Sequence, residues 1–161
     1  MAVLFSSTEN VHVHEGLQEN RSLEPGGYIE ITDLKIPYEC DDGTQLETHA
    51  HVRWTKFLLE SSAKLGRPFL DPTKFQSQLE SLGLEDVTVS VDKWPMNPWP
   101  KNAKYKELGI WACENFSSGV AAISYVLFTH GLGWSKEEVD VFLVDVRKCL
   151  RDRSIHAYLP M

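Results

Sequence analysis

The sequence lacks the features of several large protein classes. No apolar run approaches the roughly 18 residues that a membrane span needs, and the start, "MAVLFSSTEN", has no basic segment like that of a secretory signal. Asp and Glu (23) outnumber Lys and Arg (16), so that the net charge is −7. A nucleic-acid partner is not expected, because it would require a basic surface. We expect a soluble protein of the cytoplasm, with the nucleus as the alternative compartment.

Cysteine is also scarce. Cys40, Cys113 and Cys149 are odd in number, far apart and outside any C-x-x-C motif. This pattern is typical of reduced thiols in an intracellular protein and argues against a disulfide framework. The cysteines in helical segments are expected to be buried and inert.

Motifs for metals, nucleotides and nucleophiles are weak. His12 and His14 share one face of a possible strand, and Asp41-Asp42 could add oxygen ligands, but a solvated histidine pair is the favoured interpretation. His49 and His51 are two apart on a predicted helix and are expected to point to different sides. The single G-x-G, at residues 131–133, follows a helix rather than a strand, and there is no G-x-S-x-G. We expect no metal site.

Helical patterns outweigh strand patterns. The length of 161 residues indicates one domain. Alternating residues predict strands at 9–16, 26–34 and 85–94, and apolar periodicity predicts helices at 46–65, 71–82, 102–129 and 135–150. The last helix carries a capping box, Ser135 with Glu138. Around Gly119, small residues would let another element approach the third helix closely. The fold class expected is α/β and helix-dominated, with about three strands and four to five helices.

A proline-stiffened loop, "DKWPMNPWPKNAK" at 92–104, follows the last predicted strand. It gathers Trp94, Met96 and Trp99 at a strand end, where α/β sheets commonly bind ligands. The loop is interpreted either as a wall for an apolar small molecule or as a hydrophobic lid packed on the core.

Several motifs resemble one protein family when they are taken in order. They are "LEPGGYIEITDLKIPYECDDGT", "KLGRPF", "LESLGLEDVTVSVDKWPMNPWPK", "KELGIW", "FTHGLGWSKEEV" and "VRKCLRDRSIHAYLP". Together they look like the C-terminal half of the fungal LaeA-like S-adenosylmethionine-dependent methyltransferases, over roughly residues 22–160. The resemblance implies a remnant of the class I methyltransferase, Rossmann-like fold with its lid helices retained. Residues 1–22 would be a divergent segment and 23–161 the methyltransferase-like half.

The resemblance also implies what is missing. Family members hold the cofactor with a glycine-rich loop and an acidic residue in their N-terminal half, and residues 1–22 are too few to contain these. Family members also tend to continue past "HAYLP" into a further strand. We therefore expect no cofactor, and S-adenosylmethionine only if a partner chain rebuilds its site. A homodimer, or a heterodimer with a related chain, is expected to cover the exposed sheet.

Three functions remain open at this point. The favoured one is a cofactor-independent cyclase or isomerase, of the pericyclase type, that acts on an apolar natural-product intermediate. The alternatives are an inactive pseudo-methyltransferase that regulates or heterodimerises, and a fragment active only with a full-length relative. The candidate catalytic residues are His51, His130, Asp33 and Glu30, and the candidate substrate walls are Trp54, Trp94, Trp99, Trp134 and Met96.

Overall fold

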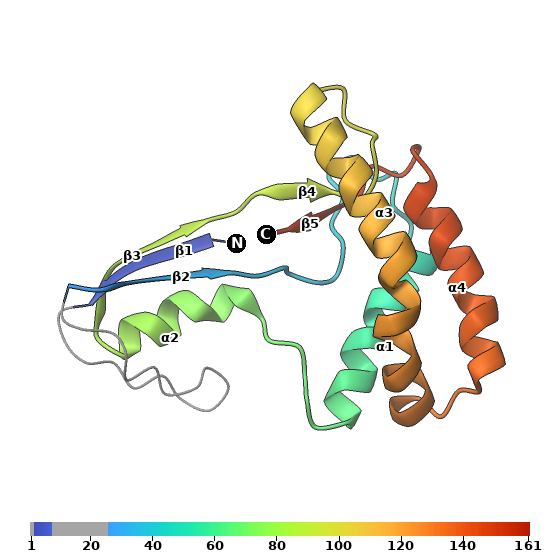
Figure 1. Ribbon diagram of the computed structural model, residues 1–161, viewed down its shortest axis with the longest axis horizontal. Coiled ribbons are helices and arrows are strands. Elements are labelled where there is room, and N and C mark those ends of the chain that lie inside the picture. Colours follow the sequence, from blue (N-terminus) through green and yellow to red (C-terminus); the bar gives the residue numbers. More distant parts are fainter. Residues whose placement is uncertain (1, 8–25) are drawn as a thin grey trace. The chain divides into compact units, whose positions relative to one another are not determined.

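The computed structural model describes residues 2–7 and 26–161, and helices dominate its α/β fold (Figure 1). Contacts divide the chain into two compact units. The first holds the described residues up to Lys35, Asp71–Asp92 and Met161, and the second holds Ile36–Leu70 and Lys93–Pro160. Each unit is described by itself, and the single domain expected from the length stays a prediction.

The first unit is a three-stranded antiparallel sheet with one helix. Strand β1 (Ala2–Ser7) lies between β2 (Tyr28–Thr32) and β3 (Leu84–Ser90), and Val3 is opposite Ile31 on one side and Val89 on the other. A 3-10 turn (Pro72–Lys74) leads into α2 (Phe75–Ser81), which packs against β3. The alternation predicted for the strands now seen as β2 and β3 is confirmed, because one face of each strand packs on the core of this unit. That core is formed by Phe75, Leu79 and Leu84 with Ile29, Ile31, Leu82, Val87 and Val89.

The strand β1 itself was not predicted. Its sequence, AVLFSS, has no period-two alternation that would distinguish a strand from any other short apolar run. The strand predicted at 9–16 lies outside the described residues.

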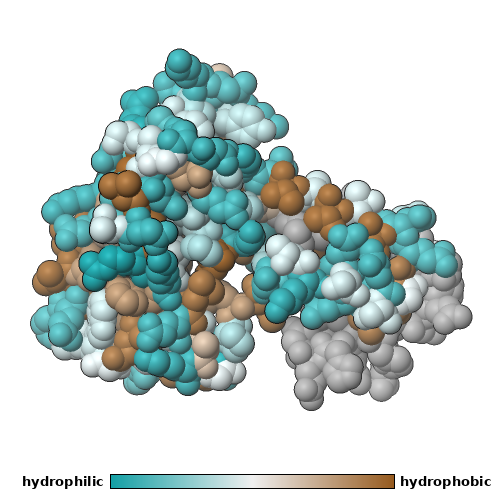
Figure 2. Space-filling model, turned by 180° about the vertical axis from the view of Figure 1, so that it is seen from behind, coloured by the Kyte–Doolittle hydropathy of each residue, from teal (hydrophilic) through white to brown (hydrophobic). Residues whose placement is uncertain are grey.

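The second unit is a helical layer joined to a small two-stranded sheet. Helices α1 (Ala50–Lys64), α3 (Ala103–Val126) and α4 (Lys136–Arg151) pack together, and a π-helical turn (Leu127–Gly131) ends α3. Strands β4 (Lys93–Pro95) and β5 (Tyr158–Pro160) pair antiparallel beside α3. Fully buried apolar side chains form the core between the helices: Val120, Phe128, Val139, Leu143, Val146 and Leu150. On the face shown in Figure 2, hydrophilic residues cover much of this unit, with apolar residues scattered among them.

Two glycines bring backbones together in the second unit. A Cβ on Gly109 would come within 3.0 Å of the Asn97–Pro98 backbone, and one on Gly131 within 3.0 Å of Ser61 in α1. No described element makes the close approach that the small residues at Gly119 would allow, because no atom lies within 4 Å of the position that its Cβ would take. Position 119 lies near the outward side of α3, whereas Gly109 is on the buried side.

The helix ends follow the capping chemistry of the sequence. Both hydrogen bonds of the capping box between Ser135 and Glu138 are present, which confirms that prediction. The Asn102 side chain caps α3 by accepting from two backbone N–H groups. Helix α1 begins at Ala50 rather than at the predicted position 46, because His49 is in an extended conformation. Within the described part of the chain, no helix is both long and apolar enough to cross a membrane.

Candidate functional site

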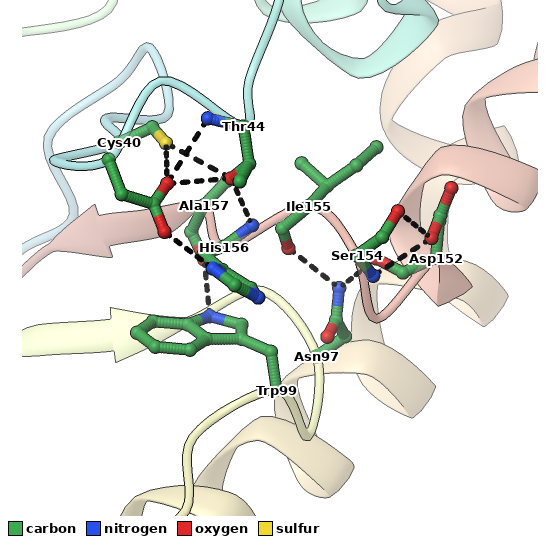
Figure 3. A network of polar contacts seen from close by, with 10 residues as sticks. Cys40, Thr44, Asn97, Trp99, Asp152, Ser154, Ile155, His156 and Ala157 are labelled. Carbon is green, nitrogen blue, oxygen red and sulfur yellow. Dashed lines mark hydrogen bonds and ion pairs between the residues drawn. The ribbon is translucent and has the colours of Figure 1, made fainter.

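An aspartate–histidine pair joins two distant loops of the second unit (Figure 3). Nδ1 of His156 lies 2.5 Å from Oδ2 of Asp42. Asp42 belongs to a turn that follows Glu39, and His156 lies in the segment between α4 and β5. Glu39 and Tyr158 exchange two backbone hydrogen bonds of 2.9 Å, and this bridge sets the two loops side by side.

The turn holds the Asp42 carboxylate in place. Oδ1 accepts from the backbone N–H of Thr44 at 3.1 Å and from its hydroxyl at 2.8 Å, as is usual for an aspartate two residues before a threonine in a turn. The Cys40 thiol donates to the same oxygen at 3.2 Å. The hydrogen bonds from His156, Thr44 and Cys40 hold the pKa of Asp42 well below its usual range, so that it faces His156 as an anion.

Two further contacts hold His156 in place. The backbone N–H of His156 donates to the Thr44 hydroxyl at 2.9 Å. The Trp99 indole lies against the ring, with centroids 4.9 Å apart and planes 31° apart, and is itself anchored by a 3.1 Å hydrogen bond from Nε1 to the Ala157 carbonyl. No residue in the described ranges is hydrogen-bonded to Nε2, and the side chain is about one-third exposed (35%).

A neighbouring carboxylate has a different environment. Asp41 pairs with the Lys93 ammonium at 2.5 Å and accepts from the Tyr158 hydroxyl at 2.7 Å. The hydrogen bonds from Lys93 and then Tyr158 lower the pKa of Asp41, and the bond to Asp41 raises that of Lys93. Lys93 is on β4 and Tyr158 is on β5, so Asp41 fastens the turn to this two-stranded sheet while Asp42 orients His156.

Asn97 supports the segment that carries His156. Its fully buried side chain donates from Nδ2 to the carbonyls of Asp152 at 2.9 Å and Ile155 at 3.4 Å, while Oδ1 has no described partner. Asp152 in turn accepts from the backbone and hydroxyl of Ser154. Figure 3 shows these contacts on one side of the loop and the His156 network on the other.

The arrangement provides what acid–base chemistry needs. A carboxylate on Nδ1 selects the tautomer that carries its proton there, which leaves Nε2 as the basic nitrogen. An imidazole held in this way can accept a proton at Nε2 and return it. Trp99 offers a flat apolar surface beside that nitrogen.

The histidines and acids nominated from the sequence do not converge on this site. His51 is fully buried, bonded through Nε2 to Gln45 at 2.9 Å, and burial followed by the charge of His49 lowers its pKa to about 4. His130 is exposed in the π-helical turn, whose Gly131 touches the far end of α1 at Ser61. The acids nominated with them, Asp33 and Glu30, belong to the first unit.

One expectation about the histidines is wrong. The rings of His49 and His51 lie 5.7 Å apart rather than on different sides of a helix. His49 is the extended residue that precedes α1, so helical geometry does not separate the two side chains. No group of three or more potential metal ligands occurs among the described residues.

Of the nominated substrate walls, Trp99 is the one that contacts His156. Trp54 is buried and donates from Nε1 to the Ser124 hydroxyl at 2.8 Å, and Met96 is 1% exposed. Trp134 packs against Phe57, Phe128 and Phe142. Trp94 is half-buried on β4. The loop at 92–104 therefore serves in part as core and in part as the wall beside His156.

Sequence reasoning missed His156 and saw Asp42 only as a possible metal ligand. A usable signal was present, because D-x-T is a turn motif that fixes a carboxylate. It lies in one of the motifs that carry the family resemblance, "YECDDGT", and His156 lies in another, "SIHAYLP". What the sequence alone did not provide was the pairing between them.

A cofactor site of the doubly wound kind would need parallel strands and a glycine-rich turn. Nucleotide-type cofactors bind a doubly wound fold at the carboxyl ends of parallel strands, beside a glycine-rich turn into a helix. Every strand pairing among the described residues is antiparallel. Gly131 of the single G-x-G is packed against Ser61.

Comparison with known proteins identifies relatives of this helix-dominated α/β chain. The chain is 34% identical over 140 residues to the probable methyltransferase tdiE of Emericella nidulans. The matched region covers 87% of this chain and 44% of the relative. It is 32% identical to the methyltransferase pytC of Aspergillus terreus (84% and 42%) and 28% identical to the secondary metabolism regulator LAE1 of Cochliobolus heterostrophus (84% and 45%). No protein family model and no solved structure matches it.

The relatives that match about 85% of this chain are fungal LaeA-like methyltransferases and regulators, and the chain is consistent with a C-terminal fragment of that family, in agreement with the resemblance of its motifs. It spans less than half the length of the curated relatives that it matches.

Proposed function

We propose that this chain takes part in fungal secondary metabolism as a proton-transfer catalyst that cyclises or isomerises an apolar natural-product intermediate without a cofactor. The observation that carries the proposal is the geometry of His156. Asp42 holds one ring nitrogen at 2.5 Å, Trp99 covers one ring face, and the second nitrogen has no described partner. The names of the relatives support the metabolic setting.

The chemistry needs no oxidant and no second substrate. Nε2 takes a proton from one atom of the bound molecule, the imidazolium is stabilised by the Asp42 carboxylate, and the same proton is returned to another atom of that molecule. The product is an isomer of the substrate and the imidazole ends neutral. Positioned general acid–base catalysis of this kind contributes about 10²–10⁴-fold to a rate.

The test is conversion of candidate intermediates by the purified chain. His156→Gln should lower the turnover number by about 10²-fold or more, in line with the loss of a general base. Asp42→Asn should lower it as well and move the pH–rate profile. Asp145→Asn removes an exposed carboxylate that pairs only with Lys148 and serves as the matched control. Conversion that survives His156→Gln but is abolished by His130→Gln would refute this assignment.

A second candidate function is supported by the extent of the match. The chain corresponds to less than half of proteins that are named methyltransferases, so it could supply the substrate side of methyl transfer beside a chain that holds the cofactor. Calorimetry with S-adenosylmethionine separates the two. We expect no heat of binding from this chain alone. Tight binding would instead favour methyl transfer as the function of the chain.

A further inference from the structure

The outward face of α3 carries large, exposed apolar side chains. Trp111 is 67% exposed and Val126 is 61% exposed, and the residues between them on the same face are exposed as well. The spacing 111, 115, 118, 122 and 126 is the i, i+4, i+7, i+11, i+15 pattern of one helical stripe. We call this set the α3 stripe: Trp111, Asn115, Ser118, Ala122 and Val126.

The α3 stripe is separate from the core of its own unit. The residues that α3 buries lie on the opposite side of the helix: Gly109, Ala112, Ser117, Val120 and Ser124. The packing of the described residues of this unit therefore leaves Trp111 and Val126 largely exposed. An exposed tryptophan on such a stripe is a typical anchor of a protein–protein interface.

The stripe is symmetric about its own midpoint. Ser118 and Gly119 lie at the centre, and Trp111 and Val126 are nearly equidistant from it, about 11 Å away on either side at 1.5 Å per residue. No atom lies within 4 Å of the position that a Cβ on Gly119 would take. A second helix can therefore approach closely at the centre, while a large side chain at each end meets the opposite end of that helix.

We propose that a second copy of this chain docks antiparallel on the α3 stripe, with the two-fold axis at Ser118 and Gly119. Trp111 of each copy then covers Ala122 and Val126 of the other, as a self-complementary interface requires. Farther out, the exposed Glu107 of one copy faces the exposed His130 of the other, so that an acceptor meets a donor at both ends. This proposal is independent of the chemistry at His156.

One helix pair forms a small interface. A buried tryptophan contributes about 150–250 Å² of surface, and a stable dimer usually buries about 800 Å² per partner. The association is therefore expected to be weak, with a dissociation constant of about 1–100 μM. Measurements must extend to several hundred micromolar protein.

Sedimentation velocity across that concentration range tests the proposal. We expect a reversible shift from one copy to two, abolished by Ser118→Glu, which places two carboxylates beside each other on the axis. Ser118→Ala is the matched control and should dimerise as the unsubstituted chain does. Trp111→Gln should raise the dissociation constant of the dimer by about tenfold or more. This variant tests the same interface if Ser118→Glu folds poorly.

The orientation is tested by oxidation of single-cysteine additions. Ser118→Cys should form a disulfide dimer, because the two positions meet at the axis. Trp111→Cys should not, since its two copies would lie about 22 Å apart along antiparallel helices, but it should pair with Val126→Cys when the two variants are mixed. The unsubstituted chain, with its own Cys40, Cys113 and Cys149, is the control. A monomer at all concentrations, or a dimer unaffected by Ser118→Glu and Trp111→Gln, would overturn the proposal.

Discussion

Nδ1 of His156 and Oδ2 of Asp42 are 2.5 Å apart, although 114 positions separate the two residues in the sequence. The contact joins the turn at 40–44 to the segment before β5, and the carboxylate also accepts from Thr44 and Cys40. These hydrogen bonds are made to the ionised form of Asp42, and they hold its pKa far below the ordinary value.

The first prediction concerns the pH dependence that follows from this lowered pKa. The ionised carboxylate stabilises the fold fully above its unfolded pKa of about 3.9, and this contribution is lost as the pH falls through the lower, folded pKa. Asp42→Asn should therefore destabilise the chain at pH 7 and somewhat less at pH 3, because pH 3 lies below the unfolded pKa but still above the folded one. Urea unfolding at both pH values measures this difference. Asp145→Asn is the control, and an equal effect of Asp42→Asn at both pH values would contradict the prediction.

The second prediction uses two glycines of α3. Gly109→Ala places a methyl group against the Asn97–Pro98 backbone, which cannot yield as a flexible side chain would, and should cost about 1–3 kcal/mol. Gly119→Ala meets open space and should be neutral or stabilise by up to about 1 kcal/mol through helix propensity. The midpoints of urea unfolding give both values. Equal effects of the two changes would contradict the prediction, because they would show that packing against the Asn97–Pro98 backbone does not set the two positions apart.

Local chemistry explains which parts of the fold could be predicted. The capping box at Ser135, the glycine that ends α1 at position 66 and the alternation of Ile29 with Ile31 each act within a few residues, so the sequence displays them directly. The start of α1 was misplaced because His49 is extended in spite of its helical neighbours. The close approach was assigned to Gly119 instead of Gly109 because the sequence does not reveal which side of α3 meets the loop.

The candidate site was harder to predict than the helices. Asp42 and His156 become a pair only through the bridge between Glu39 and Tyr158, which is a tertiary contact without a local pattern. Trp99 was among the residues nominated from its loop, but its partner His156 was not. The nominated His51 is fully buried at the start of α1, and its Nε2 is hydrogen-bonded to Gln45.

The third prediction concerns His51. Burial, and then the charge of His49, lower its pKa to about 4, whereas the unfolded value is about 6.5. Between these values the unfolded chain binds a proton that the folded chain does not, so stability falls as the pH falls from 6.5 to 4. The loss should reach about 3 kcal/mol. His51→Gln should flatten this slope in urea unfolding measured at several pH values, whereas His130→Gln, a change at an exposed position, should leave it in place.

The fourth prediction separates a structural from a substrate-binding role for Trp54. Its indole donates to the Ser124 hydroxyl at 2.8 Å, and that hydroxyl donates to the Val120 carbonyl at 2.5 Å, so α1 is tied to α3 in the core. Trp54→Phe and Ser124→Ala should each cost about 1–3 kcal/mol. The double variant should cost less than the sum of the two, because the indole N–H and the hydroxyl are each other's partner.

The measurement is a double-mutant cycle from urea unfolding, paired with the Michaelis constant once a substrate is known. A purely structural Trp54 changes stability and leaves that constant unchanged. If Trp54→Phe instead raised the Michaelis constant with little effect on stability, the pocket would extend into the space between α1 and α3. The side chain of Trp54 would then line the bound molecule, and its assignment to the core would have to be abandoned.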